Sequence, residues 1–137
     1  MTSLPSTGSH REISILLVDD QPAVRCGLRM LFQLEAGAVV VGEASSAGEA
    51  MTLAAVTRPD LVIMDVEMPG LDGIAATEQL IDAWPTCVVV ILTIHNHPQV
   101  RARAFAAGAW AVIEKCRPED VRTAFRQVIN FLDAVPQ

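Results

Sequence analysis

The sequence predicts a doubly wound α/β domain, a (βα)5 sandwich in which helices cover both faces of a five-stranded parallel sheet. Three observations predict it. Short apolar runs alternate along the chain with stretches in which apolar residues recur at helical spacing. The short runs are apolar at almost every position, which is typical of strands that are covered on both faces. The 137 residues, 51% hydrophobic and 19% charged, have the size and composition of one globular domain.

The first strand is predicted at residues 13–18, where a largely apolar run precedes a pair of aspartates. Pro22 suits the first turn of a helix, and apolar residues continue at helical spacing over 22–35. Gly37 is expected to close this helix, because glycine readily adopts the left-handed conformation that follows many helix ends.

The second strand is predicted at residues 38–44, and two serines follow it. Ser45 or Ser46 is expected to cap a helix that runs to about Thr57. Glu49 stands three residues after Ser46, which is the spacing of a capping box.

The third strand is predicted at residues 61–66, which are almost wholly apolar and follow Pro59. Residues 68–73 contain proline, glycine and aspartate and are predicted to form a loop. A third helix is expected over 74–83 and should end near Pro85.

The last two units repeat this alternation. A fourth strand is predicted at 87–93 and a fourth helix at 98–107. A shorter fifth strand is predicted at 110–114, and a final helix should begin at Pro118 and end near residue 133. The domain is therefore expected to cover 12–133. Residues 1–11 are expected to be a disordered leader or an added tail, and 134–137 a C-terminal tail.

The overall charge and hydropathy exclude several classes of protein. The net charge of −6, with basic residues spread thinly, argues against a nucleic-acid-binding surface. No apolar run approaches the roughly 20 residues that a membrane-spanning helix needs, and the first residues lack the apolar region of a signal peptide.

The three cysteines indicate a reducing environment. Cys26, Cys87 and Cys116 form no closely spaced pair, which disfavours a disulfide framework or a zinc site. Cys26 and Cys87 lie within apolar patterns and are expected in the core. We therefore expect a cytoplasmic protein.

Polar residues stand where the predicted strands end. Asp19 and Asp20 follow the first strand, Asp65 lies at the end of the third, Thr93 ends the fourth and Lys115 follows the fifth. In an open parallel sheet, ligands bind beyond the carboxyl ends of the strands, so these five side chains are expected to converge there.

Three neighbouring carboxylates need a cation or raised pKa values, because like charges about 4 Å apart repel by about 4 kcal/mol at an effective dielectric constant of 20. Hard oxygen ligands favour Mg²⁺, Ca²⁺ or Mn²⁺ over zinc. An aspartate can accept a phosphoryl group, and a lysine and a hydroxyl can stabilise phosphoryl oxygens. The set suggests metal-assisted phosphoryl transfer to an aspartate. Taken singly, each residue has a structural alternative: Asp19 and Asp20 as a turn or helix cap, Asp65 bonded to loop amides, Thr93 as a strand residue and Lys115 as a solvated charge.

Four segments resemble the receiver domain of bacterial two-component response regulators. They are VDD at 18–20, MDVEMPGLDG at 64–73, LT at 92–93 and EK at 114–115. The longer string at 58–74 and LTIH at 92–95 resemble the NarL/FixJ subclass, which usually carries a LuxR-type DNA-binding output domain. The resemblance covers 12–133 and implies a flavodoxin-like fold.

The resemblance implies a role for each site residue. Asp65 would accept a phosphoryl group from a sensor histidine kinase or a phosphotransfer protein. Asp20 would bind Mg²⁺ directly and Asp19 through water, while Asp65 and the main-chain carbonyl of Glu67 would complete the protein ligands. Lys115 and Thr93 would bind the phosphoryl oxygens. The chain would then be a signalling switch and a phosphoacceptor, without enzymatic turnover of a separate substrate.

The sequence departs from the family pattern at Val112, where most members have an aromatic residue that turns inward on activation. Glu67 and His95 occupy the family positions that adjust the lifetime of the phosphoryl group. The resemblance also makes a homodimer a candidate assembly, through the fourth helix, fifth strand and fifth helix or through the first and fifth helices. Trp110 and Phe125 are candidates for such a surface, although the core is the commoner place for aromatic residues.

Other functions remain as alternatives. A phosphotransferase of the haloacid dehalogenase type would need Asp-x-Asp where this chain has Asp65 and Glu67. A flavodoxin-like electron carrier would need a phosphate-binding loop after the first strand, where the aspartates would repel a flavin phosphate. The alternative retained here is a phosphorylation-independent receiver that acts as a protein-interaction module, which Val112 motivates. Few residues follow the last helix, so we expect a stand-alone receiver or a fragment of a longer transcription factor, with any DNA contact made by the missing output domain.

Overall fold

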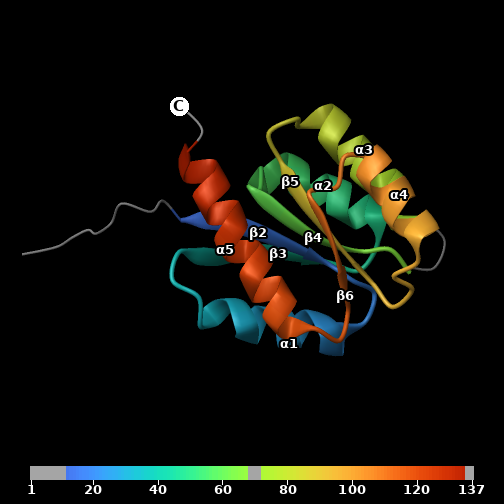
Figure 1. The fold of residues 1–137 in the computed structure, drawn as a ribbon. Helices are drawn as coiled ribbons and strands as arrows, with labels where there is room; N and C mark the ends of the chain where they lie inside the picture. The colour runs from blue at the N-terminus through green and yellow to red at the C-terminus, as the bar shows by residue number, and fades with distance from the viewer. Residues whose placement is uncertain (1–11, 68–71, 135–137) are drawn as a thin grey trace, which may run out of the picture.

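The structure is a computed structural model that describes residues 12–67 and 72–134. In these ranges strands and helices alternate strictly (Figure 1). In chain order they are β2 (Ile13–Val18), α1 (Pro22–Gln33), β3 (Ala38–Ala44), α2 (Ala47–Thr57), β4 (Leu61–Asp65), α3 (Gly73–Ala83), β5 (Val88–Thr93), α4 (Pro98–Ala106), β6 (Ala111–Glu114) and α5 (Pro118–Ala134). The predicted order, strand then helix five times, is confirmed.

The strands form one sheet of five with the order β3-β2-β4-β5-β6, and every neighbouring pair is parallel. The predicted doubly wound, flavodoxin-like architecture is therefore confirmed. The register pairs Val18 of β2 with Met64 of β4, and Asp65 with Leu92 of β5. The carboxyl ends of the central strands therefore lie level with one another, and the residues that follow them meet at one edge of the sheet.

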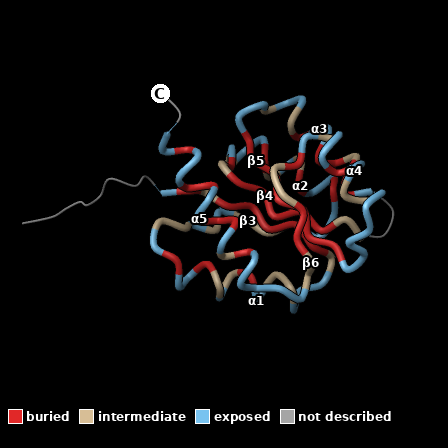
Figure 2. The backbone as a smooth tube through the Cα atoms, in the orientation of Figure 1, coloured by how far each residue is buried: buried red, intermediate tan, exposed pale blue. Residues whose placement is uncertain are grey.

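Helices cover both faces of the sheet (Figure 1). On one face α1 and α5 pack against the strands, and Phe32 and Phe125 meet edge to face with their ring centroids 5.4 Å apart. On the other face α2, α3 and α4 bury mostly small or aliphatic side chains. Every residue of β4 and β5 is buried, and Figure 2 shows the central strands as a buried layer between helices whose outer sides are exposed. This burial on both faces explains why these strands are apolar at every position before their last residues, Asp65 and Thr93.

Local capping sets the ends of several helices. Ser46 caps α2 by accepting a hydrogen bond from the Glu49 amide at 3.1 Å, and the Glu49 carboxylate accepts one from the Ser45 amide at 2.7 Å. Both serines named by the sequence therefore take part, and the return bond goes to the residue before the cap. The first helix ends at Gln33, two residues earlier than predicted, and Gly37 lies in the turn into β3 with a φ of +86°.

A few details differ from the sequence predictions. Cys26 is exposed on α1, so its expected core position is wrong, whereas Cys87 is buried as expected. Several strand and helix ends shift by one residue; for example, β4 ends at Asp65 and β6 begins at Ala111.

Three expectations fall wholly or mainly outside the described ranges. They are the leader at 1–11, the greater part of the loop predicted at 68–73, and the C-terminal tail, of which only Ala134 is described, as the last residue of α5. Within the described ranges, every helix is too short or too polar to cross a membrane.

Candidate functional site

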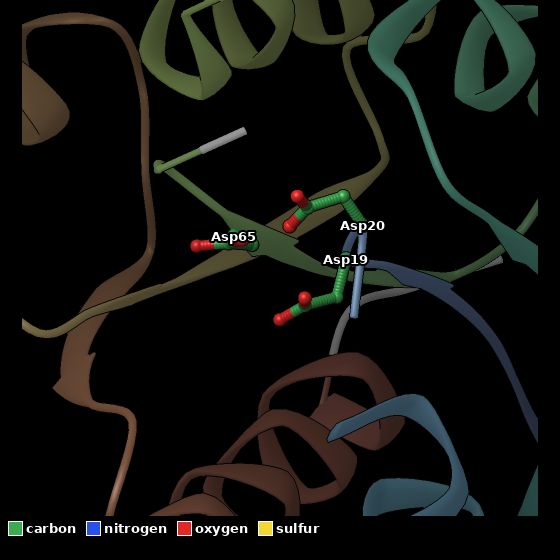
Figure 3. A group of neighbouring side chains, drawn as sticks. All are labelled: Asp19, Asp20 and Asp65. Atoms are coloured by element: carbon green, nitrogen blue, oxygen red, sulfur yellow. The ribbon is translucent and has the colours of Figure 1, made fainter. Parts of the chain in front are cut away.

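Three aspartates from two neighbouring strands meet at the carboxyl edge of the sheet (Figure 3). Asp19 and Asp20 follow β2, and Asp65 is the last residue of β4. One carboxylate oxygen of each lies within 4.8 Å of the others. Asp19 and Asp65 are 1% and 0% exposed, whereas Asp20 is partly exposed at the rim. The predicted convergence of these acids is therefore observed, and the pairing of β2 with β4 produces it.

Lys115 reaches this acidic group from β6, an edge strand of the sheet. It follows β6, and its main-chain amide donates to the carbonyl of Thr93 at 3.1 Å. Its Nζ lies 3.2 Å from Oδ2 of Asp19 and 3.2 Å from Oδ2 of Asp65. The chain has no other lysine. One ammonium group therefore bridges the two most deeply buried carboxylates.

The two oxygens of each buried aspartate differ in their partners. Oδ1 of Asp19 accepts a hydrogen bond from the Gln21 amide at 2.8 Å, and Oδ1 of Asp65 accepts one from the Glu67 amide at 3.0 Å. The Oδ2 atoms make no hydrogen bond of good geometry and face only the Lys115 ammonium. These buried, under-coordinated oxygens are the atoms that could bind a cation or attack an electrophile.

Burial and mutual contact shift the pKa values of Asp65 and Lys115. Desolvation raises the pKa of Asp65, and the charge of Asp19 adds to this, against the hydrogen bond from the Glu67 amide and the attraction of Lys115. Burial also disfavours the charged form of Lys115, but its close ion-pair contacts with the Asp19 and Asp65 carboxylates outweigh this and raise its pKa. The lysine therefore stays protonated, while ionised Asp65 carries an energetic penalty in the fold.

The acids fit a hard divalent cation. They offer several carboxylate oxygens in a small volume, two of them without a hydrogen-bond donor. Mg²⁺ prefers such oxygens, takes only one or two carboxylates and retains water molecules. Because Asp20 is partly exposed, it offers a carboxylate to a cation that keeps part of its hydration shell. The residues present therefore fit a site for a hard divalent cation.

Thr93 and Glu67 lie at the same edge but bind each other. The Thr93 hydroxyl is buried and donates a hydrogen bond to Oε2 of Glu67. Oε1 of Glu67 accepts a bond from the Ile94 amide at 3.2 Å, and the Thr93 oxygen accepts one from the His95 amide at 2.9 Å. The structure therefore places Thr93 at the predicted edge, with its hydroxyl directed to Glu67.

Two supporting residues were not found from the sequence. Arg25 of α1 donates to the carbonyl of Asp19 at 2.6 Å and pairs with Glu43 of β3 at 3.1 Å, which fixes the turn after β2. Gly73 begins α3 so close to β4 that a Cβ atom there would lie 2.3 Å from the carbonyl oxygen of Asp65. Arg25 carries no local sequence signal, and Gly73 was visible only as a loop glycine.

Val112, which stands where most family members have an aromatic residue, is a core residue. Val112 is 8% exposed and packs in the core on the side of α2, α3 and α4, and its carbonyl accepts a bond from Arg101 at 3.3 Å. Of the two aromatic residues considered for a dimer surface, Phe125 is 1% exposed and belongs to the core. Trp110 is partly buried and its ring lies 6.3 Å from that of Phe131.

Comparisons with known proteins agree with this geometry. The response regulator receiver domain family model matches residues 15–126. Response regulator UvrY of Escherichia coli is 35% identical over 119 residues, which cover 86% of this chain and 55% of UvrY. Response regulator GacA of Pseudomonas aeruginosa is 39% identical over 118 residues, covering 85% of this chain and 55% of GacA. The chain thus spans about half the length of these curated relatives.

Solved structures show the same relationship. A LuxR-family two-component response regulator from an Aurantimonas species superposes with a TM-score of 0.82 at 37% identity, covering 87% of this chain and 86% of that chain. Relatives of the NarL/FixJ type therefore appear in both sequence and structure. The family model covers most of the chain, and the acidic residues meet where such a domain has them, so this chain belongs to the response regulator receiver domain family.

Proposed function

We propose that this chain is a phosphorylation-dependent switch of a two-component signalling system, and that Asp65 accepts the phosphoryl group. The observation that carries the proposal is Oδ2 of Asp65, a buried oxygen without a hydrogen bond that lies 3.2 Å from the Lys115 ammonium and beside two further carboxylates. Membership of the receiver family supports it. The donor would be a phosphohistidine of a sensor kinase or of a phosphotransfer protein.

The chemistry is a single displacement at phosphorus. Oδ2 of Asp65 attacks, a P–O bond forms, and the bond between phosphorus and the imidazole nitrogen of the donor breaks. The electron pair stays on that nitrogen, which takes up a proton, and the product is an acyl phosphate. Lys115 pairs with the carboxylates before the transfer and with the phosphoryl oxygens after it. The Thr93 hydroxyl is a second donor to the phosphoryl group.

Asp19, Asp20, Asp65 and the main-chain carbonyl of Glu67 would hold Mg²⁺, with Asp19 acting through water. The bound cation supplies positive charge that offsets the carboxylates and the phosphoryl oxygens. Asp65 already carries a pKa raised by burial and by Asp19. Keeping it ionised, as nucleophilic attack requires, is therefore easier with such a cation present.

The wider setting follows from the relatives. The chain matches only about half the length of UvrY and GacA, so we propose that a LuxR-type DNA-binding output domain completes the whole protein. The domain itself, proposed to span 12–133, would not bind DNA, because its chain carries a net charge of −6. It would act in the cytoplasm as a phosphoacceptor, with autodephosphorylation as its only catalytic activity, and as a homodimer if phosphorylation favours assembly.

The test is a mass measurement. The protein is incubated with acetyl phosphate and Mg²⁺ and the intact mass is recorded. We expect a gain of one phosphoryl group in the wild type and in Asp82→Asn, which changes an exposed aspartate of α3, and no gain in Asp65→Asn. A wild type that gains nothing, or an Asp65→Asn variant that gains as much, contradicts the proposal.

The second candidate is a receiver that binds its partner without phosphorylation. Val112 favours it, because a small core residue stands where an inward-turning aromatic side chain would report the state of Thr93. The same mass measurement separates the two functions. A folded wild type that takes up no phosphoryl group from the small donor supports this second candidate.

A further inference from the structure

We propose that the carboxylate of Glu67 is an internal competitor of the phosphoryl group: it occupies the hydroxyl of Thr93 and the amide of Ile94 before phosphorylation and must leave when Asp65 is modified. The inference rests on the proposed function for its second half. Its first half concerns contacts within the unmodified protein and can be tested separately.

The contacts join three segments. Glu67 lies two residues after Asp65, and its amide donates to Oδ1 of that aspartate at 3.0 Å. Its side chain turns toward the end of β5, where Oε2 accepts from the Thr93 hydroxyl and Oε1 accepts from the Ile94 amide at 3.2 Å. The main-chain amide of Glu67 therefore bonds Asp65, the proposed phosphoryl acceptor. Its carboxylate accepts from two donors at the end of β5, the Thr93 hydroxyl and the Ile94 amide.

The occupation is exclusive because a threonine hydroxyl has one proton to donate. The Thr93 oxygen also accepts a bond from the His95 amide at 2.9 Å, so the hydroxyl already both donates and accepts. A phosphoryl oxygen on Asp65 can take the proton of Thr93 only if Glu67 gives it up. Charge acts in the same direction, because a phosphoryl group would bring a second anion beside the Glu67 carboxylate.

Release of Glu67 would loosen the segment from Ile94 to His97. The amides of Ile94 and His95 both depend on the Thr93–Glu67 pair. At the start of the helix that follows, the N-cap residue His97 makes no side-chain capping hydrogen bond, and the contacts there include those of partly buried Val100 and of Arg101, which donates to the Val112 carbonyl at 3.3 Å. Glu67 would thus determine whether the segment that leads into α4 is tied to the end of β4. This coupling would not need an aromatic side chain at the position of Val112.

The first experiment uses unmodified protein. Hydrogen exchange of the Ile94 and His95 amides is followed by NMR in the wild type, Glu67→Gln and Glu67→Ala. We expect Ile94 to exchange about tenfold faster in Glu67→Ala, the loss expected for one hydrogen bond to a charged group, and by less in Glu67→Gln, which keeps an acceptor. Glu78→Gln, an exposed site on α3, should change nothing. Equal exchange in all four proteins overturns the proposal.

The second experiment measures the affinity of beryllofluoride, a phosphoryl mimic, by calorimetry with Mg²⁺. We expect Glu67→Ala to bind it about tenfold more tightly than the wild type, and Glu67→Gln by a smaller factor. In a Thr93→Val background the effect of Glu67→Ala should shrink, because the shared donor is gone. If Glu67→Gln and Glu67→Ala raise the affinity equally, and Thr93→Val leaves this gain unchanged, then only the charge of Glu67 acts. That result would overturn the proposal.

The two experiments separate the two levels of inference. A wild type that takes neither beryllofluoride nor a phosphoryl group removes the proposed function and, with it, the competition with a phosphoryl group. The exchange of Ile94 would still show whether Glu67 holds the end of β5. Conversely, tight binding to the wild type with unchanged affinity in both Glu67 variants keeps the switch and discards the competitor.

Discussion

The first residue of α3, Gly73, packs directly against the main chain of Asp65. A Cβ atom at Gly73 would lie 2.3 Å from the carbonyl oxygen of Asp65 and 2.8 Å from Cα of Val66. Backbone atoms cannot yield as a flexible side chain can. The helix and the acceptor strand therefore fit together only with glycine at this position, and the site depends on a residue that touches no ligand.

We predict that Gly73→Ala lowers the free energy of unfolding by about 1–3 kcal/mol, the usual cost of overpacking, and slows uptake of the phosphoryl group by displacing Asp65. Urea denaturation and the mass assay measure the two effects. Gly48→Ala is the matched control, because a Cβ there meets nothing within 4 Å. It should be neutral or more stable by up to about 1 kcal/mol. A Gly73→Ala variant that behaves like the control would contradict the packing argument.

Asp65→Asn should raise the melting temperature of the metal-free protein. The pKa of Asp65 is raised by burial and by the charge of Asp19, so its ionised form is less favourable in the folded than in the unfolded chain. Neutralising it removes this penalty at pH 7. Scanning calorimetry in EDTA checks the shift, with Asp82→Asn as the exposed control. A lower melting temperature for Asp65→Asn would show that the Lys115 contact outweighs the penalty.

Mg²⁺ should stabilise the wild type and stabilise Asp65→Asn less, because the variant has lost one carboxylate ligand. Binding to the folded state alone adds about 2.7 kcal/mol when the free cation is at 100 times its Kd. The measurement is the melting temperature over a Mg²⁺ titration at constant ionic strength. Equal shifts in the two proteins would place the cation elsewhere.

Lys115→Met should destabilise the protein strongly, by about 3–5 kcal/mol, because it leaves buried carboxylates without their cation. The side chain is only 12% exposed, and the carboxylates it faces are 1% and 0% exposed. The loss should be smaller in an Asp65→Asn background, where one of these charges is already absent. Denaturation of the four proteins of this cycle gives the coupling. Arg117→Met, at an exposed position, is the control, and strict additivity would argue against the bridge.

Glu35 provides a pH-dependent contribution far from the acidic site. Burial works against its charged form, but hydrogen bonds from Arg122 and Arg126 of α5 outweigh burial and hold its pKa below the ordinary value of 4.5. A lowered carboxyl pKa stabilises the fold above that ordinary value, and the contribution is lost as the pH falls through the folded-state pKa. Glu35→Gln should therefore be less stable than the wild type at pH 7, and the gap should close below about pH 4.5.

Denaturation of the two proteins from pH 3 to pH 7 checks this dependence. Glu78→Gln, at an exposed position, controls for the loss of one negative charge. A gap between Glu35→Gln and the wild type that stays constant over this range would mean that Glu35 contributes by packing and not by its charge.

Local patterns predicted most of the fold. Pro22 and Ser46 mark helix starts because each satisfies the local geometry of a first turn, and both helices begin there. The acidic site was also accessible, because the carboxyl ends of all strands in a parallel sheet lie at the same edge, whatever the strand order. That rule brought Asp65 and Lys115 together from opposite halves of the chain.

The remaining features depend on contacts between distant side chains. Glu35 meets Arg126, which is 91 residues away, and no local pattern pairs them. The direction of the Glu67 side chain depends on a free hydroxyl and a free amide at the end of β5. The exposure of Cys26 was missed because a cysteine within a helical apolar pattern can lie on either side of the buried stripe.

The sheet order has a consequence for folding. The chain leaves β2, builds β3 and α2, and only then returns as β4 to lie beside β2. Until that crossover is complete, the acids after β2 and Asp65 are distant groups on a flexible polymer, with weak affinity for any divalent ion. Ion capture by this protein should therefore accompany formation of the native state, and a partly folded chain that lacks the β2–β4 ladder should bind such ions no better than an unstructured peptide.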